Sequence, residues 1–192
     1  MNNTTISDKT LEAIGSLQNN VIPKKQKQKK LPVYLTEEEF IDLIKATRKP
    51  HHKLAYNLAY GAGLRIGEVI SLLPENLDFK SKRIFIRNAK GGKDRIVPIP
   101  KGMTESNLKL LPLKCGIRAL EIAFKGHAKK AKVFKEGLVY HSLRHSFSVR
   151  CMEKGMPLNT IQILLGHENI STTSIYTRIN PKDALESYEK YW

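Results

Sequence analysis

Cysteine is scarce in this sequence. The 192 residues include only Cys115 and Cys151, which stand far apart and form no Cys-x-x-Cys pair. A disulfide framework and a zinc finger both need more cysteines at shorter spacings. The scarcity argues against both classes and is typical of a protein in the reducing cytosol, so we expect a cytoplasmic location.

Long apolar runs are also missing. No run reaches the ~18 residues that a membrane-spanning helix needs. The polar N-terminus MNNTTISDKT lacks the apolar centre of a secretory signal. We therefore expect no membrane partner. Apolar residues still make up 41% of the chain, which is enough for the core of one domain of ordinary size.

Acidic residues are few beside the basic ones. The chain has 18 Asp and Glu against 33 Lys and Arg, which gives a net charge of +15. Residues 1–32 contribute +4 of this charge, and residues 33–192 contribute +11. A basic globular body indicates a polyanionic partner, most often nucleic acid. Proteins that bind membrane surfaces and ribosomal proteins share this composition and stay as alternatives.

The chain divides at about residue 32. Residues 1–32 include the lysine-rich run PKKQKQKK and are predicted to form a flexible basic arm. The lysines predicted to bind nucleic acid here are Lys24, Lys25, Lys27, Lys29 and Lys30. A solubilising leader explains the same run equally well. Residues 33–192 are predicted to form one folded domain.

Hydrophobic periodicity predicts a mostly helical α+β domain. A Thr-x-x-Glu capping box at Thr36 and Glu39 opens an amphipathic helix in LTEEEFIDLIKATR. Further helices are predicted over about 51–61, from about Ile66, over 114–131, 141–155 and 158–165, from Ser171 and from Pro181. The stretch KRIFIRNAKGGKDRIVPIP alternates around Gly91-Gly92, which predicts a small antiparallel β-hairpin.

Some residues could act on a phosphate, although each has a plainer explanation when taken alone. Arg65 stands where a helix begins among glycines, yet a surface salt bridge with Glu68 would also explain it. His141 and Arg144 are three residues apart and share one helical face. On such a face a guanidinium can bind two phosphate oxygens and an imidazole can move a proton. His145 is expected to support the fold.

Three further candidates lie in the hairpin and near the end of the chain. Lys90 abuts the Gly-Gly turn, with Lys93 as a competitor, and a solvated lysine explains either of them. His167 follows a glycine at the end of a short predicted helix, where a lone histidine is usually structural. Tyr176 is one of seven tyrosines, and an ordinary half-buried aromatic residue is its plainer explanation.

The order of these residues is more specific than any one of them. The stretches GLRIGEV, AKGGKDRIVPI, HSLRHSFSV and LLGHENISTTSIYTR hold Arg65, Lys90, His141 with Arg144, and His167 with Tyr176, in that series. Over residues 33–180 the chain resembles the catalytic domain of the tyrosine recombinases, the lambda-integrase and Xer-like family. Tyr140 stands where a proline is common in that family.

The resemblance implies that the protein cuts and rejoins DNA strands without a metal, another cofactor or ATP. Tyr176 would attack the scissile phosphate to form a 3′-phosphotyrosine, while Arg65 and Arg144 would hold its nonbridging oxygens. The other roles it implies are proton movement by His141, protonation of the departing 5′ oxygen by Lys90, and a hydrogen bond to the phosphate from His167. Lys93 and Arg95 are expected as further DNA contacts.

The resemblance also implies partners. We expect double-stranded DNA and a homotetramer on paired recombination sites, and an accessory DNA-bending protein is left open. Family members usually carry a helical core-binding domain before the catalytic one, and here only 32 mostly polar residues precede it, so the arm is expected to replace part of that grip. A type IB topoisomerase and a non-catalytic DNA-binding relative are the alternatives.

Overall fold

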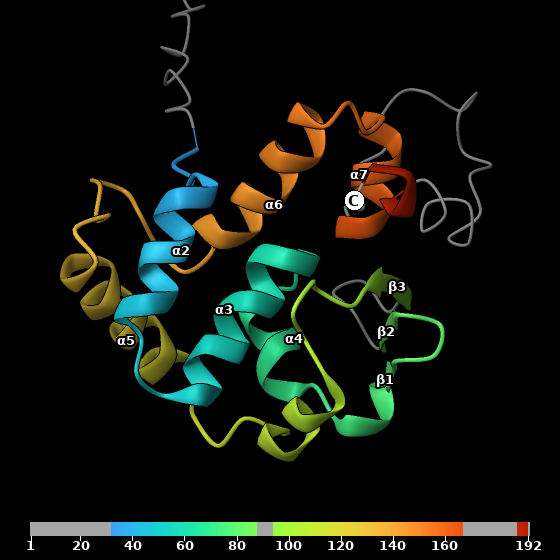
Figure 1. Ribbon diagram of the computed structural model, residues 1–192, viewed down its shortest axis with the longest axis horizontal. Helices are drawn as coiled ribbons and strands as arrows, with labels where there is room; N and C mark the ends of the chain where they lie inside the picture. The colour runs from blue at the N-terminus through green and yellow to red at the C-terminus, as the bar shows by residue number, and fades with distance from the viewer. Residues whose placement is uncertain (1–31, 88–93, 167–187, 192) are drawn as a thin grey trace, which may run out of the picture. The chain divides into compact units, whose positions relative to one another are not determined.

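A computed structural model describes residues 32–87, 94–166 and 188–191. The chain divides after Leu31 into two units, and the described helices and strands belong to the second unit, Pro32–Trp192. Its helices are α2 (Glu37–Ala46), α3 (Pro50–Ala62), α4 (Ile66–Ser71), α5 (Ile117–Lys130), α6 (Ser142–Glu153) and α7 (Leu158–Leu165) (Figure 1). Short 3-10 turns cover η1 (Pro74–Asn76) and η2 (Glu105–Leu110). The predicted arm lies outside the described residues and stays a prediction.

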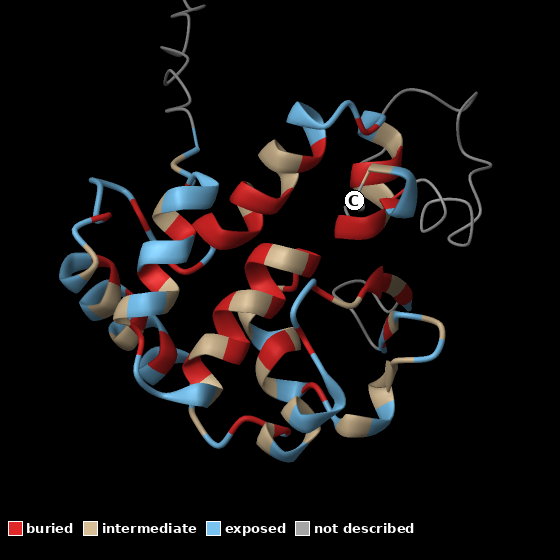
Figure 2. Ribbon diagram, in the orientation of Figure 1, coloured by how far each residue is buried: buried red, intermediate tan, exposed pale blue. Residues whose placement is uncertain are grey.

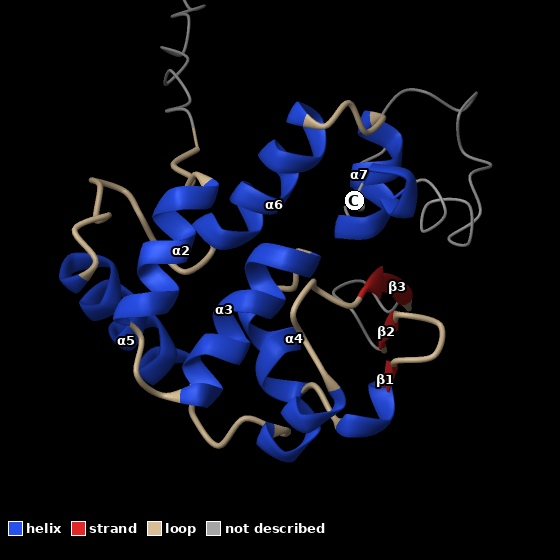
Figure 3. Cartoon of the chain, in the orientation of Figure 1, coloured by secondary structure: helices blue, strands red, loops and turns tan. Residues whose placement is uncertain are grey.

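A small antiparallel sheet completes the fold. Its strands β1 (Leu77–Asp78), β2 (Arg83–Ile86) and β3 (Arg95–Pro98) lie in that order, with Ile84 opposite Val97 (Figure 3). Ile84 and Ile86 are buried while Phe85 is exposed, as the alternation predicts. The sheet and the helices together confirm the predicted mostly helical α+β fold. The predicted Gly91-Gly92 turn lies outside the described residues.

The start of α2 confirms the predicted capping box. The Thr36 Oγ1 atom accepts a hydrogen bond from the Glu39 backbone N–H at 3.3 Å, and the Glu39 carboxylate accepts one from the Thr36 N–H at 2.9 Å. Two backbone donors that the first turn of a helix leaves without partners are thereby satisfied. The buried Phe40 and Leu43 then turn this helix toward the core.

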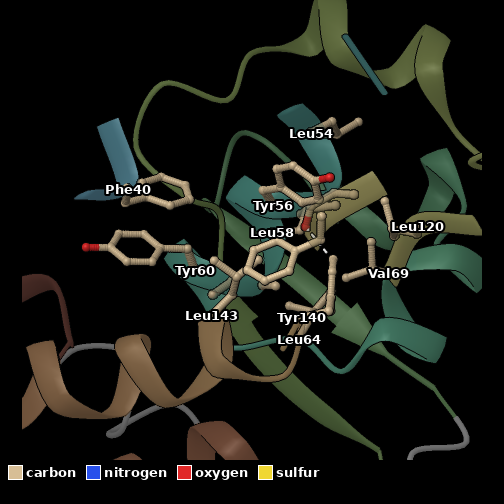
Figure 4. Close-up of a cluster of buried hydrophobic side chains, with 14 of the residues drawn as sticks. Phe40, Leu54, Tyr56, Leu58, Tyr60, Leu64, Val69, Leu120, Tyr140 and Leu143 are labelled. Atoms are coloured by element: carbon tan, nitrogen blue, oxygen red, sulfur yellow. Dashed lines mark hydrogen bonds between the residues drawn. The ribbon is translucent and has the colours of Figure 1, made fainter. Parts of the chain in front are cut away.

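Helix α3 lies at the centre of the core. Its residues Leu54, Ala55, Leu58 and Ala59 are all buried. Figure 2 shows the buried residues of α3 and α6 where the two helices pack together. The Tyr60 ring of α3 stacks on the Phe40 ring of α2 with centroids 3.7 Å apart (Figure 4). An aromatic contact therefore joins α2 and α3.

The helices at the end of the described chain agree with the sequence. The predicted helix 158–165 is α7, and Gly155 at φ 79° follows α6 as its predicted end. The helices predicted from Ser171 and from Pro181 lie mostly outside the described residues. Tyr188 stacks on Phe147 of α6, and its hydroxyl donates to the Gly61 carbonyl at 3.4 Å. In the part of the chain that the structure describes, no helix is both long and apolar enough to cross a membrane.

His52 in α3 makes stability depend on pH. This side chain is buried, and its Nδ1 atom meets no hydrogen-bond partner among the described residues. Burial and the nearby charges of His51, His127 and Lys49 lower the pKa of His52 to about 4. An unfolded histidine has a pKa near ~6.5, so protonation favours the unfolded chain below that value.

We therefore expect stability to be retained above pH 6.5 and to fall as the pH drops toward 4. Between pH 7 and pH 5 the loss should be about 1 to 2 kcal/mol in the free energy of unfolding. Urea titrations across this range measure the loss. The His52→Leu variant should show a flatter pH dependence than the wild type, and parallel profiles would show that other groups carry it.

Candidate active site

The turn between α3 and α4 presents Arg65. Gly63 caps α3 with φ 67°, a left-handed conformation that favours glycine. A Cβ atom added there would come within 2.8 Å of the Phe147 ring and 2.9 Å of the Leu165 side chain. Only glycine therefore fits this close approach, and the chain restarts as a helix immediately after Arg65.

Glu68 in the first turn of α4 holds Arg65 in place. Its carboxylate accepts a hydrogen bond from the Arg65 backbone N–H at 2.7 Å and another from the Arg65 guanidinium at 2.9 Å. The salt bridge that offered the plainer explanation of Arg65 is therefore present. It fixes the direction of the guanidinium, and 24% of the Arg65 side chain stays exposed.

Arg144 lies in the first turn of α6 and is almost fully buried. One amino group donates to the carbonyl of Gly63 at 2.6 Å, and the other donates to the carbonyl of Leu165. These carbonyls lie at the C-terminal ends of α3 and α7, where a helix leaves acceptors without intrahelical partners. Arg144 therefore joins the two helix ends, and cations are favoured at that end of the helix dipole.

Three arginines meet at the C-terminal end of α7. Three consecutive carbonyls accept from them: Leu164 from Arg95, Leu165 from Arg144 and Gly166 from Arg65. The arginines come from β3, α6 and the start of α4, which are far apart in the sequence. This set of three guanidinium groups around one helix end, with Glu68 between two of them, is called the arginine cluster below.

The arginine cluster carries a net positive charge. Burial, with the charges of Arg65 and Arg95, lowers the pKa of Arg144 to about 9, so this group is still protonated at neutral pH. Burial opposes the ionisation of Glu68, but hydrogen bonds and charge from Arg95 and Arg65 lower the pKa of its carboxyl to about 2. Three cations around one carboxylate make a site for an anion such as phosphate.

His141 directly precedes α6 and is exposed, whereas Arg144 one turn later is buried. The two therefore differ in access to solvent, although the sequence predicts them on one face. The His145 ring packs edge to face on the His141 ring at 4.9 Å between centroids, which fits its predicted supporting role. The Tyr140 hydroxyl donates to the Ala55 carbonyl at 2.8 Å and so ties the start of α6 to α3.

A pocket of about 740 Å³ opens beside the arginine cluster. It is lined by α4, the segment after it, β2 and His141, and Arg65 and Glu68 form part of its wall. The pocket therefore brings together Arg65 and His141, two of the predicted site residues. Across residues 32–87, 94–166 and 188–191, no three His, Cys, Asp or Glu side chains gather in a way that could hold a metal ion.

The structure places Arg95, which is predicted as a further DNA contact, inside the arginine cluster. Its side chain is buried on β3, and its guanidinium donates to both oxygens of Glu68 and to the Leu164 carbonyl. In the described structure this side chain therefore faces the interior of the domain. The sequence carried a signal for this burial, because Arg95 lies two residues before the buried Val97 and therefore on the same face of the strand.

The importance of Glu68 and of the backbone is not visible in the sequence. The spacing indicates Glu68 only as a surface partner of Arg65. No sequence pattern indicates which backbone carbonyls lie close to the arginines in the folded chain. The other predicted residues lie outside the described residues and stay predictions: Lys90, Lys93, His167, Tyr176, Lys24, Lys25, Lys27, Lys29 and Lys30.

Comparison with known families gives a match over most of the chain. The profile of the phage integrase family matches residues 33–118 and 114–183. The tyrosine recombinase XerA of Pyrococcus horikoshii is 35% identical over 189 residues, which cover 91% of this chain and 65% of that relative. The chain thus spans just under two thirds of the length of this curated relative.

Solved structures show the same fold. A crystal structure of XerA recombinase matches with a TM-score of 0.61 at 28% identity, covering 84% of this chain and 66% of that one. The XerH site-specific recombinase bound to difH substrate matches with a TM-score of 0.62 over 86% of this chain and 56% of that one. The second match, at 24% identity, shows the fold alone.

Proposed function

The chain belongs to the phage integrase family, and on that premise we propose that it is a site-specific DNA recombinase acting through a 3′-phosphotyrosine intermediate. The observation that supports this most is the arginine cluster. Arg65 and Arg144 meet at the end of α7, beside a pocket that His141 also lines. His167 and Tyr176 follow α7 in the sequence.

The first step is attack by Tyr176 on the scissile phosphate. The phenol oxygen forms a bond to phosphorus, and the bond from phosphorus to the 5′ oxygen breaks. The phenol proton leaves by way of His141, and Lys90 gives a proton to the departing 5′ oxygen. A free tyrosine has a pKa near ~10 and is a weak nucleophile at neutral pH, so the surrounding cations must stabilise the developing charge.

Arg65 and Arg144 supply that stabilisation in this proposal. Each guanidinium can donate two hydrogen bonds to a nonbridging oxygen pair, and one such preorganised donor is worth about 3–4 kcal/mol in the transition state. Arg65 already forms part of the pocket wall. Arg144 is 3% exposed, so we expect bound phosphate to replace one of its carbonyl partners. His167 adds a hydrogen bond to the phosphate.

The second step reverses the first with a different strand. The phosphotyrosine ester keeps the energy of the broken bond, so a new 5′ hydroxyl can displace Tyr176 without ATP. The chemistry uses a side-chain nucleophile and fixed cations, and no step is assigned to a metal ion. Resistance to EDTA is therefore expected.

Double-stranded DNA is the substrate we propose. The chain is strongly basic, and the exposed face of α5 carries Arg118, Lys125, Lys129 and Lys130. Phosphate backbones bind such surfaces. The related fold of XerH was solved with its difH substrate bound. We also propose a homotetramer on paired sites and a cytoplasmic location, where that DNA lies, and an accessory DNA-bending protein is a further candidate partner.

A trapping experiment tests the proposed function. The substrates are duplexes tiled across the DNA that flanks the gene. Each is nicked so that the short fragment with the new 5′ hydroxyl diffuses away after cleavage, which prevents rejoining. The wild type should give a covalent protein–DNA band on a denaturing gel, and the band should persist in EDTA. No band on any duplex would contradict a recombinase and favour a non-catalytic DNA-binding relative. Relaxation of supercoiled plasmids without strand exchange would favour a type IB topoisomerase.

The basic arm gives a separate prediction about binding. Each lysine that neutralises a phosphate steepens the plot of log affinity against log salt by about 0.9. If most of Lys24, Lys25, Lys27, Lys29 and Lys30 bind DNA, deletion of residues 1–31 should flatten that slope by roughly 3–4. Sequence preference should change little, because phosphate contacts do not read bases.

A salt titration of both proteins on one duplex measures this slope. The full-length chain with these five lysines changed to glutamine is the matched control, since it keeps the length of the arm and loses its charge. Equal flattening in both variants would assign the effect to the lysines. Identical slopes for all three proteins would show that the arm only solubilises the chain.

A further inference from the structure

Arg95 is an enclosed part of the arginine cluster. Its amino groups donate to the two oxygens of Glu68 at 2.7 and 2.6 Å, and its Nε atom donates to the Leu164 carbonyl at 3.0 Å. The side chain is 6% exposed. Such a paired two-point contact between a guanidinium and a carboxylate fixes the orientation of both groups. Arg95 on β3 therefore fixes the position of the Glu68 carboxylate.

The same carboxylate holds Arg65. Each Glu68 oxygen accepts one bond from Arg95 and one from Arg65, so the three residues form a single hydrogen-bonded unit. Without Arg95, only bonds to Arg65 would hold this carboxylate in the cluster. The carboxylate could then rotate, and the guanidinium of Arg65 would turn with it.

Arg95 also sets the end of α7. It donates to the Leu164 carbonyl, and the next two carbonyls along the chain accept from Arg144 and Arg65. A Cβ atom added at Gly166 would lie 2.9 Å from the Cδ atom of Arg95, so the arginine side chain lies directly against this backbone. The end of α7 thus meets Arg95 through a hydrogen bond and through close packing.

We propose that Arg95 is a positioning residue for strand cleavage, which holds Glu68 and the end of α7 so that Arg65 points into the pocket. This rests on the proposed function, because it requires Arg65 to bind the scissile phosphate. Arg95 itself touches no DNA. It acts on the reaction through Glu68 and through the backbone from which the chain continues toward Tyr176.

The test separates cleavage from binding. The Arg95→Met variant keeps much of the side-chain volume but can neither pair with Glu68 nor donate to Leu164. We expect single-turnover cleavage of a nicked duplex at saturating protein to fall about 10- to 100-fold, the scale for a misplaced catalytic group. The dissociation constant and its salt dependence should stay within about twofold, whereas a direct phosphate contact would flatten the salt slope by about 0.9.

A substrate with an uncharged linkage gives a rate ratio that a loss of protein stability would not change. In a methylphosphonate linkage, a methyl group replaces one nonbridging oxygen, so the transition state carries one negative charge less for Arg65 to stabilise. The ratio of wild-type to Arg95→Met cleavage rates should therefore shrink about tenfold or more on this substrate. Val97→Ala, a buried change on the same strand, and Arg48→Gln, an exposed loss of charge, should show no such shrinkage.

All rates are compared below the melting temperature of each variant. If Arg95→Met does not fold, Arg95→Lys takes its place, and failure of both to fold would make Arg95 a folding residue and overturn the proposal. Equal cleavage by wild type and Arg95→Met, or an unchanged ratio on the methylphosphonate, would also overturn it. If the wild type forms no adduct on any duplex, the proposed function fails first and the positioning role falls with it.

Discussion

Replacement of Tyr176 by phenylalanine is expected to abolish the covalent adduct completely while DNA binding stays unchanged. The change removes one hydroxyl, and that oxygen is the atom proposed to bond to phosphorus. No other group in the proposed mechanism can form the ester, so no slow residual adduct is expected. A nicked duplex on a denaturing gel measures the adduct, and a mobility shift under native conditions measures binding.

Tyr34→Phe is the matched control, because Tyr34 is an exposed tyrosine far from the arginine cluster in sequence. Its adduct should form at the wild-type rate. An adduct that persists in the Tyr176→Phe protein would show that the nucleophile is another residue. Peptide mapping of the trapped wild-type adduct would then identify it.

The second large effect is expected for lysine at either Arg65 or Arg144. Lysine keeps the charge but lacks the planar fork that donates to two oxygens at once. Cleavage should fall by at least about 10²-fold in each variant, the scale for loss of one transition-state donor. Single-turnover rates on the nicked duplex measure this loss. Near-normal cleavage by Arg65→Lys would reduce Arg65 to a salt-bridge partner of Glu68.

The two variants should differ in stability. Arg144 is buried and bridges the ends of α3 and α7, and a lysine cannot reach both the Gly63 and Leu165 carbonyls. A buried acceptor left unpaired costs about 1–3 kcal/mol, so Arg144→Lys should unfold at clearly lower urea concentrations. Arg65 is partly exposed, and its lysine variant should lose less than about 1 kcal/mol. Equal stability losses would contradict these assigned positions.

Much of the fold was readable from the sequence because its signals are local. The capping box of Thr36 and Glu39 and the alternation of Ile84 and Ile86 each involve neighbours within a few residues. Such contacts form in any structure that contains the helix or the strand. The helix over 158–165 was placed correctly for the same reason, by a short apolar period that ends at a glycine.

The sequence by itself also determined the family, because the residue types predicted to act on a phosphate occur in it in the order typical of that family. Only the tertiary structure decided that Arg65 is partly exposed at the pocket whereas Arg95 and Arg144 are buried. Arg95 stands two residues after Lys93, a predicted DNA contact, yet in the fold its side chain is buried against Glu68. The reason is that three consecutive backbone carbonyls at the end of α7 accept hydrogen bonds from guanidinium groups on three elements that are distant in the sequence. The amino-acid sequence does not indicate where a backbone carbonyl lies in the fold.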